Sequence, residues 1–140
     1  MHNDIKLDNI LIGHTDKSLI HLIDFGLSVS YLQEDGSTHV EKKNEEKFSG
    51  NILFASLNSC RGNNKSRRDD VESMVYVMLY LLSNNHLPWN DLHEKFTNNE
   101  YDFQDLLNER LDLQYTKQIF KMAPRALRLL LKKIVTLKFD

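Results

Sequence analysis

The chain has 140 residues, of which 41% are hydrophobic and 27% are charged. This balance is typical of one folded globular domain and argues against wholesale disorder. The formal net charge of −2 gives no sign of the basic excess found in proteins that bind nucleic acids or membrane surfaces. We therefore predict a domain with no nucleic-acid partner and no membrane partner.

Two short β-prone runs lie near the start of the chain. Residues 10–12 and 19–23 are mostly Ile and Leu, and residues 13–18 between them are rich in turn-forming types. This pattern predicts a β-hairpin with a rather long loop. Residues 33–47 are polar and charged without a sustained period, which predicts a mobile surface loop.

Three helices are predicted in the second half of the chain. Ser66 is a candidate N-cap, followed by acidic residues and then by nine apolar residues, 74–82. Because this run is apolar on every side, we expect it in the middle of the core, ending at Asn84 and Asn85. Residues 103–113 and 124–137 predict two further helices. The predicted fold class is mainly α with a small β-hairpin (α+β).

The predicted hairpin brings two polar side chains together. Asn9 immediately precedes the first run and Asp24 immediately follows the second. In an antiparallel pair the start of one strand lies beside the end of the other, so we expect both side chains at one edge. An amide oxygen and a carboxylate suit Mg²⁺, which takes few protein ligands and fills its octahedron with water and phosphate oxygens.

Two further residues are expected near the same edge. Asp4 lies five positions before Asn9, so a loop can turn its carboxylate toward the same point. Lys6 lies between them and could place a positive charge against a transferring phosphate. A carboxylate base, a lysine and two metal ligands are the groups that phosphoryl transfer needs.

The motifs around these residues resemble those of protein kinases. Residues 2–9, His-Asn-Asp-Ile-Lys-Leu-Asp-Asn, resemble the kinase catalytic loop, and residues 24–26, Asp-Phe-Gly, resemble the metal-binding motif. The resemblance implies that Asp4 is the catalytic base and that Lys6 contacts the γ-phosphate of ATP. It also implies that Asn9 and Asp24 hold Mg²⁺, so that the cofactors are ATP and Mg²⁺.

Later segments are similar to the casein kinase I group. Residues 55–58, Ala-Ser-Leu-Asn, stand where most kinases have Ala-Pro-Glu, and residues 66–73, Ser-Arg-Arg-Asp-Asp-Val-Glu-Ser, also look like this group. There Asp70 is the residue that bonds back to the catalytic-loop backbone. The resemblance covers nearly the whole chain and implies a protein-kinase-like fold, C-terminal lobe only. Residues 1–140 would then be a partial kinase domain that phosphorylates Ser and Thr hydroxyls of protein substrates.

The parts of a kinase N-lobe are absent from these residues: a glycine-rich loop, a strand lysine and its helix glutamate. We therefore expect the missing N-lobe to be a partner in cis, Met1 to be an internal methionine of a longer frame, and the chain alone to be inactive. The resemblance thus leads us to expect that the kinase sequence continues beyond both ends of the chain. The single Cys60, the lack of a signal-peptide pattern and the lack of a long apolar run predict an intracellular protein of the cytoplasm or the nucleus.

Three residues depart from the pattern and leave alternatives open. Asn3 replaces a common arginine, Asn51 replaces a threonine that supports the catalytic aspartate, and Leu53 replaces an arginine that reads acidic or phosphorylated substrates. One alternative is therefore a pseudokinase or a protein-interaction module. The other is a non-functional gene fragment that never folds stably. The chain retains Asp4, Lys6, Asn9 and Asp24, which argues against a pseudokinase or interaction module.

Overall fold

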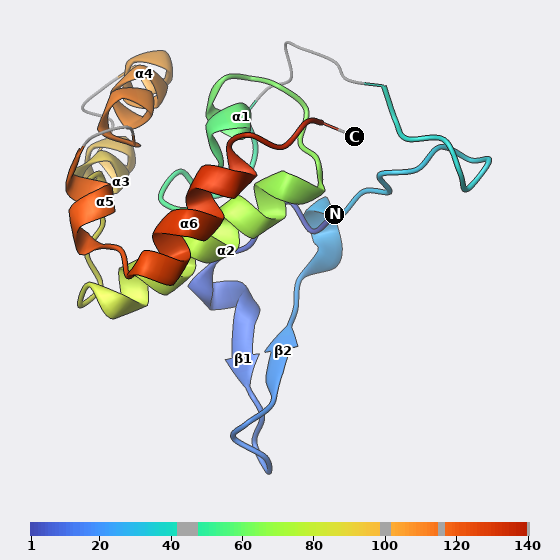
Figure 1. Ribbon diagram of the computed structural model, residues 1–140, viewed down its shortest axis with the longest axis horizontal. Helices are drawn as coiled ribbons and strands as arrows, with labels where there is room; N and C mark the ends of the chain where they lie inside the picture. Colours follow the sequence, from blue (N-terminus) through green and yellow to red (C-terminus); the bar gives the residue numbers. More distant parts are fainter. Residues whose placement is uncertain (42–47, 99–101, 115–116, 140) are drawn as a thin grey trace.

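The computed structural model describes residues 1–41, 48–98, 102–114 and 117–139 (Figure 1). Within them the fold is mostly helical with one two-stranded antiparallel sheet, so the predicted fold class is confirmed. The elements in chain order are β1 (Ile10–Ile12), β2 (Ile20–Leu22), α1 (Leu57–Cys60), α2 (Arg67–Leu82), α3 (Asn90–Thr97), α4 (Phe103–Gln114), α5 (Lys117–Met122) and α6 (Arg125–Ile134). None of the helices in these ranges has both the length and the apolar character needed to cross a bilayer.

The hairpin extends away from the helical body (Figure 1). Ile10 pairs with Leu22 and Ile12 with Ile20, and the backbone N–H of Ile23 donates to the carbonyl of Asn9 at 3.0 Å. These bonds place the residues that flank the strands at the end nearest the helices. The strands themselves are largely exposed, with Ile12 at 67% and Ile20 at 71%. The hairpin therefore presents apolar side chains to solvent.

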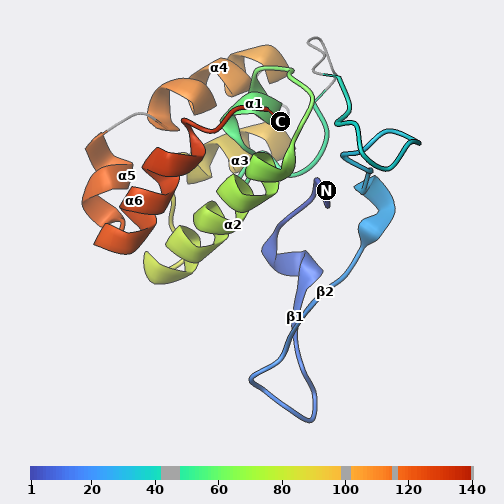
Figure 2. The same cartoon turned by 45° about the vertical axis from the view of Figure 1, so that its right-hand side comes forward.

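Helix α2 runs through the centre of the helical body, with α6 packed beside it (Figures 1 and 2). Ser66 is its N-cap, as predicted, but the capping acceptor is the carboxylate of Asp69, which receives the backbone N–H of Ser66 at 2.6 Å. Asn84 and Asn85 follow the helix with φ of 58° and 62°. These left-handed conformations, which asparagine tolerates better than most residues, turn the chain out of the helix.

The prediction that the whole apolar run of α2 lies in the core is wrong in part. Val75, Tyr76, Val77 and Leu79 are buried, whereas three others are exposed on the surface: Met74 at 47%, Leu81 at 55% and Leu82 at 64%. The helix therefore has one apolar face that no described residue covers. Its sequence cannot reveal this, because buried and exposed faces are equally apolar.

Only some of the other helices were predicted from the sequence. Helices α4 and α6 lie where two helices were predicted, whereas α1, α3 and α5 were not predicted. Of the predicted surface loop, residues 42–47 lie outside the described residues. The described part of that loop contains a turn closed by an isolated bridge between Leu32 and His39, in which the carboxylate of Asp35 accepts from the backbone N–H groups of Ser37 and Thr38.

Arg110 is a charged side chain that is fully buried in the core. The guanidinium of Arg110 in α4 lies 3.4 Å from the centroid of the Trp89 ring and donates to the carbonyl of Ala55 at 3.0 Å. The indole N–H of Trp89 in turn donates to the carbonyl of Leu53 at 2.7 Å. The cation thus joins α4 to the segment that precedes α1, and stacking on the aromatic ring offsets part of its desolvation.

Folding of the chain can be tested through Cys60. Its side chain is 1% exposed, and burial raises the pKa of its thiol to about 11. Because the thiolate is the reactive form, we expect a thiol reagent at pH 8 to modify the native chain at least about 100-fold more slowly than the chain in denaturant. Equally fast modification of both would show that the isolated chain does not fold, as the gene-fragment alternative requires.

Candidate functional site

Three of the four predicted site residues lie together in the loop that leads into β1. The ammonium of Lys6 lies 2.8 Å from Asp4 Oδ2, and the Asn9 amide nitrogen donates to the same oxygen at 3.1 Å. The Asn9 amide nitrogen also donates to the Asp4 backbone carbonyl at 2.9 Å. A short 3₁₀ turn, Leu7–Asn9, closed by the Asn9 N–H on the Lys6 carbonyl, brings these side chains into reach. Asp4 and Asn9 are buried, with 8% and 4% exposure.

The fourth residue, Asp24, follows β2 at the same end of the hairpin. Its backbone is left-handed, with φ of 60° and ψ of 74°, and its Oδ1 accepts from the Gly26 N–H at 3.2 Å. The positive φ belongs to Asp24, and a Cβ at Gly26 would come within 3.1 Å of Asp24 Oδ1. Gly26 is therefore suited to the turn by its small size.

The charges at the site favour the protonated form of Lys6. The hydrogen bond to Asp4 is the largest cause that raises the pKa of Lys6 above its usual value, and the negative charges of Asp4, Asp8 and Asp24 add to it. Partial burial of the ammonium acts in the opposite direction but does not reverse the shift. Lys6 is thus a fixed cation at neutral pH, and Asp24 is close enough to act on it.

The donor set at the end of the hairpin fits Mg²⁺. The Asn9 amide nitrogen is directed at Asp4, which leaves the amide oxygen as the atom that can face a cation. Asp24 engages one carboxylate oxygen with Gly26 and is exposed. Within the described ranges no group of three or more His, Cys, Asp and Glu side chains is placed to hold a metal. This is compatible with Mg²⁺, which retains several waters and uses few protein oxygens.

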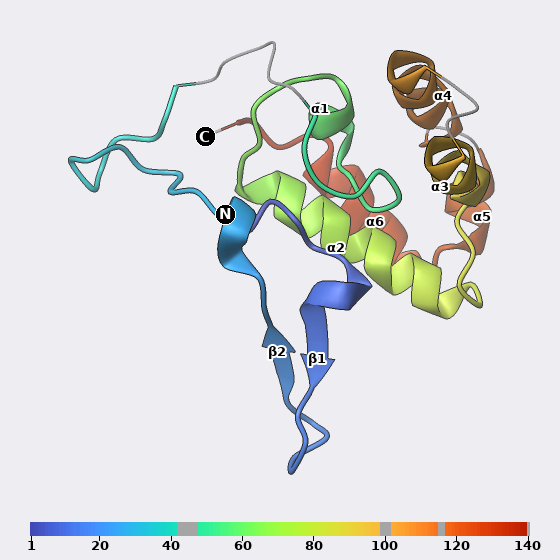
Figure 3. The same cartoon turned by 180° about the vertical axis from the view of Figure 1, so that it is seen from behind.

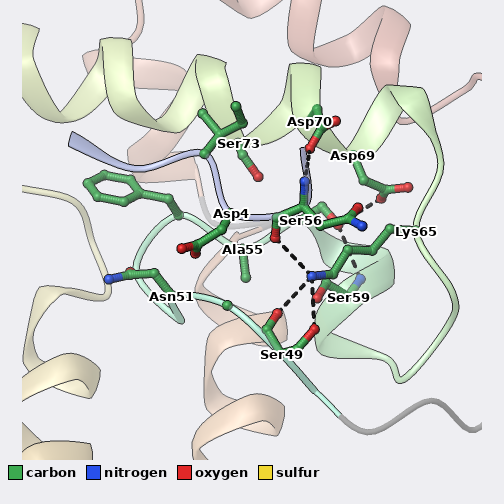
Figure 4. Close-up of a pocket in the computed structure, with 14 residues that line it drawn as sticks. Asp4, Ser49, Asn51, Ala55, Ser56, Ser59, Lys65, Asp69, Asp70 and Ser73 are labelled. Atoms are coloured by element: carbon green, nitrogen blue, oxygen red, sulfur yellow. Dashed lines mark hydrogen bonds between the residues drawn. The ribbon is translucent and has the colours of Figure 1, made fainter. Parts of the chain in front are cut away.

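The backbone of the loop that resembles a kinase catalytic loop is fixed to α2 by Asp70, as the resemblance implied. Asp70 Oδ2 accepts from the backbone N–H of His2 at 2.7 Å. Its Oδ1 accepts from the backbone N–H of Asn3 at 2.8 Å (Figure 4). Asn3 has a φ of 68°, a conformation that asparagine adopts more readily than arginine. The Asn3 side chain donates to the carbonyl of Leu27 at 3.0 Å. Its uncharged amide therefore still links the loop to the segment after Asp24.

His2 connects the same loop to the hairpin. Its Nε2 donates to the Ile23 carbonyl at 3.0 Å, and its Nδ1 accepts from the backbone N–H of Asp4 at 3.3 Å. Its ring also lies 5.0 Å from the ring of Phe25, between centroids. The buried imidazole thus links the residue beside Asp24 to Asp4. His2 was part of the motif that identified the loop, but no contact of its side chain was predicted.

Residues 49–51 form the wall of a pocket opposite Asp4 (Figure 4). Gly50 has a φ of 107°, and a Cβ there would lie 3.3 Å from the Asn3 carbonyl oxygen and 3.5 Å from Asp4 Oδ1. Asn51, which replaces the supporting threonine, instead accepts from the Leu53 N–H at 2.8 Å through its side-chain oxygen. Among the described residues, none donates a hydrogen bond to Asp4 Oδ1, which is buried there. This oxygen can therefore accept one from a bound group.

Leu53 lies in the core and does not face a substrate. Its side chain is 8% exposed and belongs to the cluster that contains Val75 and Trp89. An arginine at this position would have to bury its charge or displace the surrounding chain. Leu53 therefore takes the place of the arginine as a packed core residue.

The sequence did not reveal three charged residues that organise this region: Lys65, Glu72 and Arg110. Glu72 is buried and accepts from the Leu57 backbone N–H at 2.9 Å and from the Tyr76 hydroxyl at 2.7 Å. Desolvation raises the pKa of its carboxyl, while Leu57, Tyr76 and the positive charge of Arg110 act against that shift. Apart from Tyr76, which lies four positions from Glu72, the partners named for these residues lie far away in sequence. No local pattern around the three residues indicated these contacts.

Known protein kinases have sequences similar to this chain. The model of the fungal protein kinase family matches residues 1–82. A probable casein kinase I homolog of Encephalitozoon cuniculi is 43% identical over 89 residues, covering 64% of this chain and 27% of the relative. Casein kinase I homolog 1 of Saccharomyces cerevisiae is 37% identical over 109 residues, covering 76% of this chain and 20% of the relative. The chain thus spans between a fifth and about a quarter of the length of these relatives.

The anchoring role of Asp70 can be tested by substitution. Asp70→Ala removes the acceptor of two backbone N–H groups, so we expect the free energy of unfolding to fall by about 2–4 kcal/mol. Urea denaturation followed by circular dichroism measures this change. Asp105→Ala, which removes an exposed carboxylate from α4, is the matched control. A loss for Asp70→Ala within about 0.5 kcal/mol of the control would contradict the assignment.

Proposed function

Because this chain belongs to the protein kinase family and has the sequence features of casein kinase I, we propose that it is the catalytic lobe of a serine/threonine kinase. The reaction would transfer the γ-phosphoryl group of Mg-ATP to hydroxyl groups of protein substrates. The observation that carries the proposal is the bonded group of Asp4, Lys6 and Asn9 at the end of the hairpin that also bears Asp24.

Asp4 is proposed as the base that receives the proton of the substrate hydroxyl. Its Oδ2 is engaged by Lys6 and Asn9, which fixes the plane of the carboxylate. Its Oδ1 is not engaged and faces the pocket wall formed by residues 49–51. A base held in one orientation by two hydrogen bonds loses little entropy when it meets the hydroxyl, which is the main contribution that a protein makes to this chemistry.

Lys6, Asn9 and Asp24 are proposed to bind the phosphates and the metal. Bound Mg-ATP would bring the transferable phosphoryl group and the cation that neutralises it. The amide oxygen of Asn9 and the carboxylate of Asp24 would hold Mg²⁺, and the ammonium of Lys6 would face the γ-phosphate. Lys6 is 24% exposed at its side chain, so it can exchange part of its contact with Asp4 for a phosphate oxygen.

The nucleotide site requires a second lobe. The 140 residues contain no glycine-rich loop, no strand lysine and no paired helix glutamate of the kinase type. The hairpin carries exposed apolar side chains, among them Leu11 at 48%, Ile12 at 67% and Ile20 at 71%. Exposed apolar surface of this kind is typical of an interface, so we propose that a kinase N-lobe covers it.

One observation favours a second candidate, a pseudokinase or protein-interaction module. The Asn51 side chain bonds to Leu53, and the buried Asp4 Oδ1 is left without the support that a threonine would give. In this alternative the exposed hairpin would be used for binding and the site would be inert. The two candidates differ in whether a complete nucleotide site restores phosphoryl transfer.

The first expected outcome concerns the chain alone. Because half of the nucleotide site is absent, the purified 140-residue chain with Mg-ATP and a Ser- or Thr-containing peptide should transfer no phosphate above a buffer control. Incorporation of the radiolabelled γ-phosphate into the peptide measures this. Phosphorylation by the wild-type chain that Asp4→Asn abolishes would contradict the need for a second lobe.

The second expected outcome concerns the chain joined to an N-lobe from a casein kinase I relative. This fusion should phosphorylate the peptide in the presence of Mg²⁺, and Asp24→Ala should lower the rate roughly 100-fold or more, because the metal loses a carboxylate ligand. Asp105→Ala in the same fusion is the matched control. If the fusion folds and stays inert, the interaction-module candidate is favoured. If Asp24→Ala retains the wild-type rate, the metal assignment is wrong.

A further inference from the structure

Lys65 lies between the catalytic loop and residues 49–51, outside the group of residues predicted from the sequence. Its ammonium donates to the Asn3 backbone carbonyl at 3.0 Å, to the Ser49 carbonyl at 2.7 Å and to the Ser49 hydroxyl at 3.3 Å (Figure 4). Lys65 is partly buried, and it precedes α2 by two residues. An ammonium with three donors is therefore bonded to oxygens from two separate segments of the chain.

The bond to Asn3 acts on the peptide unit that precedes Asp4. The carbonyl of this unit accepts from Lys65, while its N–H, which belongs to Asp4, donates to His2 Nδ1 at 3.3 Å. The two N–H groups before it are held by Asp70. Lys65 thus completes a set of bonds that fixes each peptide plane on the way to the Asp4 side chain.

The bonds to Ser49 fix the opposite wall of the pocket. Ser49 is followed by Gly50, where a Cβ would lie 3.5 Å from Asp4 Oδ1 and 3.7 Å from the Lys65 ammonium. The Asn51 side chain then closes a turn on Leu53. The distance between Asp4 and residues 49–51 is therefore set by one ammonium that bonds both sides. A charge-assisted hydrogen bond in a partly buried site is roughly twice as strong as a neutral one.

We propose that Lys65 is a positioning residue that holds residues 49–51 at a fixed distance from Asp4. It acts through the Asn3 carbonyl and Ser49 and does not touch the reacting atoms. The oxygens that it contacts are the Asn3 and Ser49 carbonyls and the Ser49 hydroxyl, all of the chain itself. The catalytic consequence rests on the proposed kinase function, whereas the structural consequence does not.

The brace is tested in the full 140-residue chain by residue-resolved amide hydrogen exchange. Lys65→Met keeps most of the side-chain length but removes the charge and all three donors. We expect the amides of Asp4 and Leu53 to exchange at least about tenfold faster in this variant, with α2 amides such as Val77 unchanged. Lys65→Arg, which keeps a cation with several donors, should restore most of the protection. Lys17→Met, on the exposed hairpin loop, is the charge-matched control and should match the wild type.

Two results would overturn the proposal. One is unchanged exchange of Asp4 and Leu53 in Lys65→Met. The other is a parallel increase at Val77, because this would show a loss of global stability rather than of a local brace. Failure of Lys65→Arg to restore any protection would also count against a role for the charge.

The catalytic consequence is tested separately in the N-lobe fusion. Lys65→Met should lower kcat about 10- to 100-fold while KM for ATP changes by less than about threefold, since the substrate hydroxyl and the base lose their alignment. An equal loss in kcat and in the affinity for ATP would contradict positioning of Asp4. If the wild-type fusion is inert, the proposed function fails, and the exchange measurement still decides whether Lys65 is a brace.

Discussion

The two carboxylate oxygens of Asp70 accept the backbone N–H groups of His2 and Asn3, and the arrangement of the site follows from this contact. Asp70 lies in the first turn of α2, whose middle is buried in the core. Because the core holds α2 in place, the Asp70 carboxylate also fixes the backbone of His2 and Asn3, which belong to no helix or strand. Asn3 takes a left-handed conformation between these bonds, which turns the chain so that Asp4 points away from α2 (Figure 4).

The hairpin fixes the position of the remaining site residues. The 3₁₀ turn that contains Asn9 leads directly into β1, and Ile23 bonds to Asn9 across the pair. His2 donates to the Ile23 carbonyl, so its buried imidazole links the loop of residues 2–9 to the end of β2 (Figure 3 shows the two segments from behind). The position of Asp24 relative to Asp4 is thus set by strand pairing and one histidine. A two-stranded hairpin is marginal by itself, so these contacts at its base are what keep it aligned.

The sequence predicted the local parts of this structure well. The β-runs, the N-cap at Ser66, the turn at Asn84 and the group formed by Asp4, Lys6 and Asn9 all depend on neighbours within a few positions. The parts that it missed depend on distant partners. Lys65 meets Ser49 and Asn3, and Arg110 meets Ala55 and Trp89, because the fold brings those segments together. The exposed face of α2 at Met74 and Leu82 was missed for a related reason, since apolar residues look the same whether or not a neighbour covers them.

The residues that depart from the kinase pattern share a physical feature. Asn3 and Leu53 are uncharged where arginines were expected, and both are used internally: Asn3 bonds to Leu27, and Leu53 packs in the core. The cation of Lys65 is also turned inward, onto backbone oxygens. Among the groups proposed for the chemistry, the hydrogen bond to Asp4 and the negative charges of nearby aspartates, including Asp24, raise the pKa of Lys6. Under the proposed function, phosphoryl transfer needs the charges at the end of the hairpin, whereas residues 49–51 are held by a neutral bond within the turn and by the inward-facing cation of Lys65. Selection of substrates by their own negative charges would require cations that face outward, and neither Leu53 nor Asn3 can supply one.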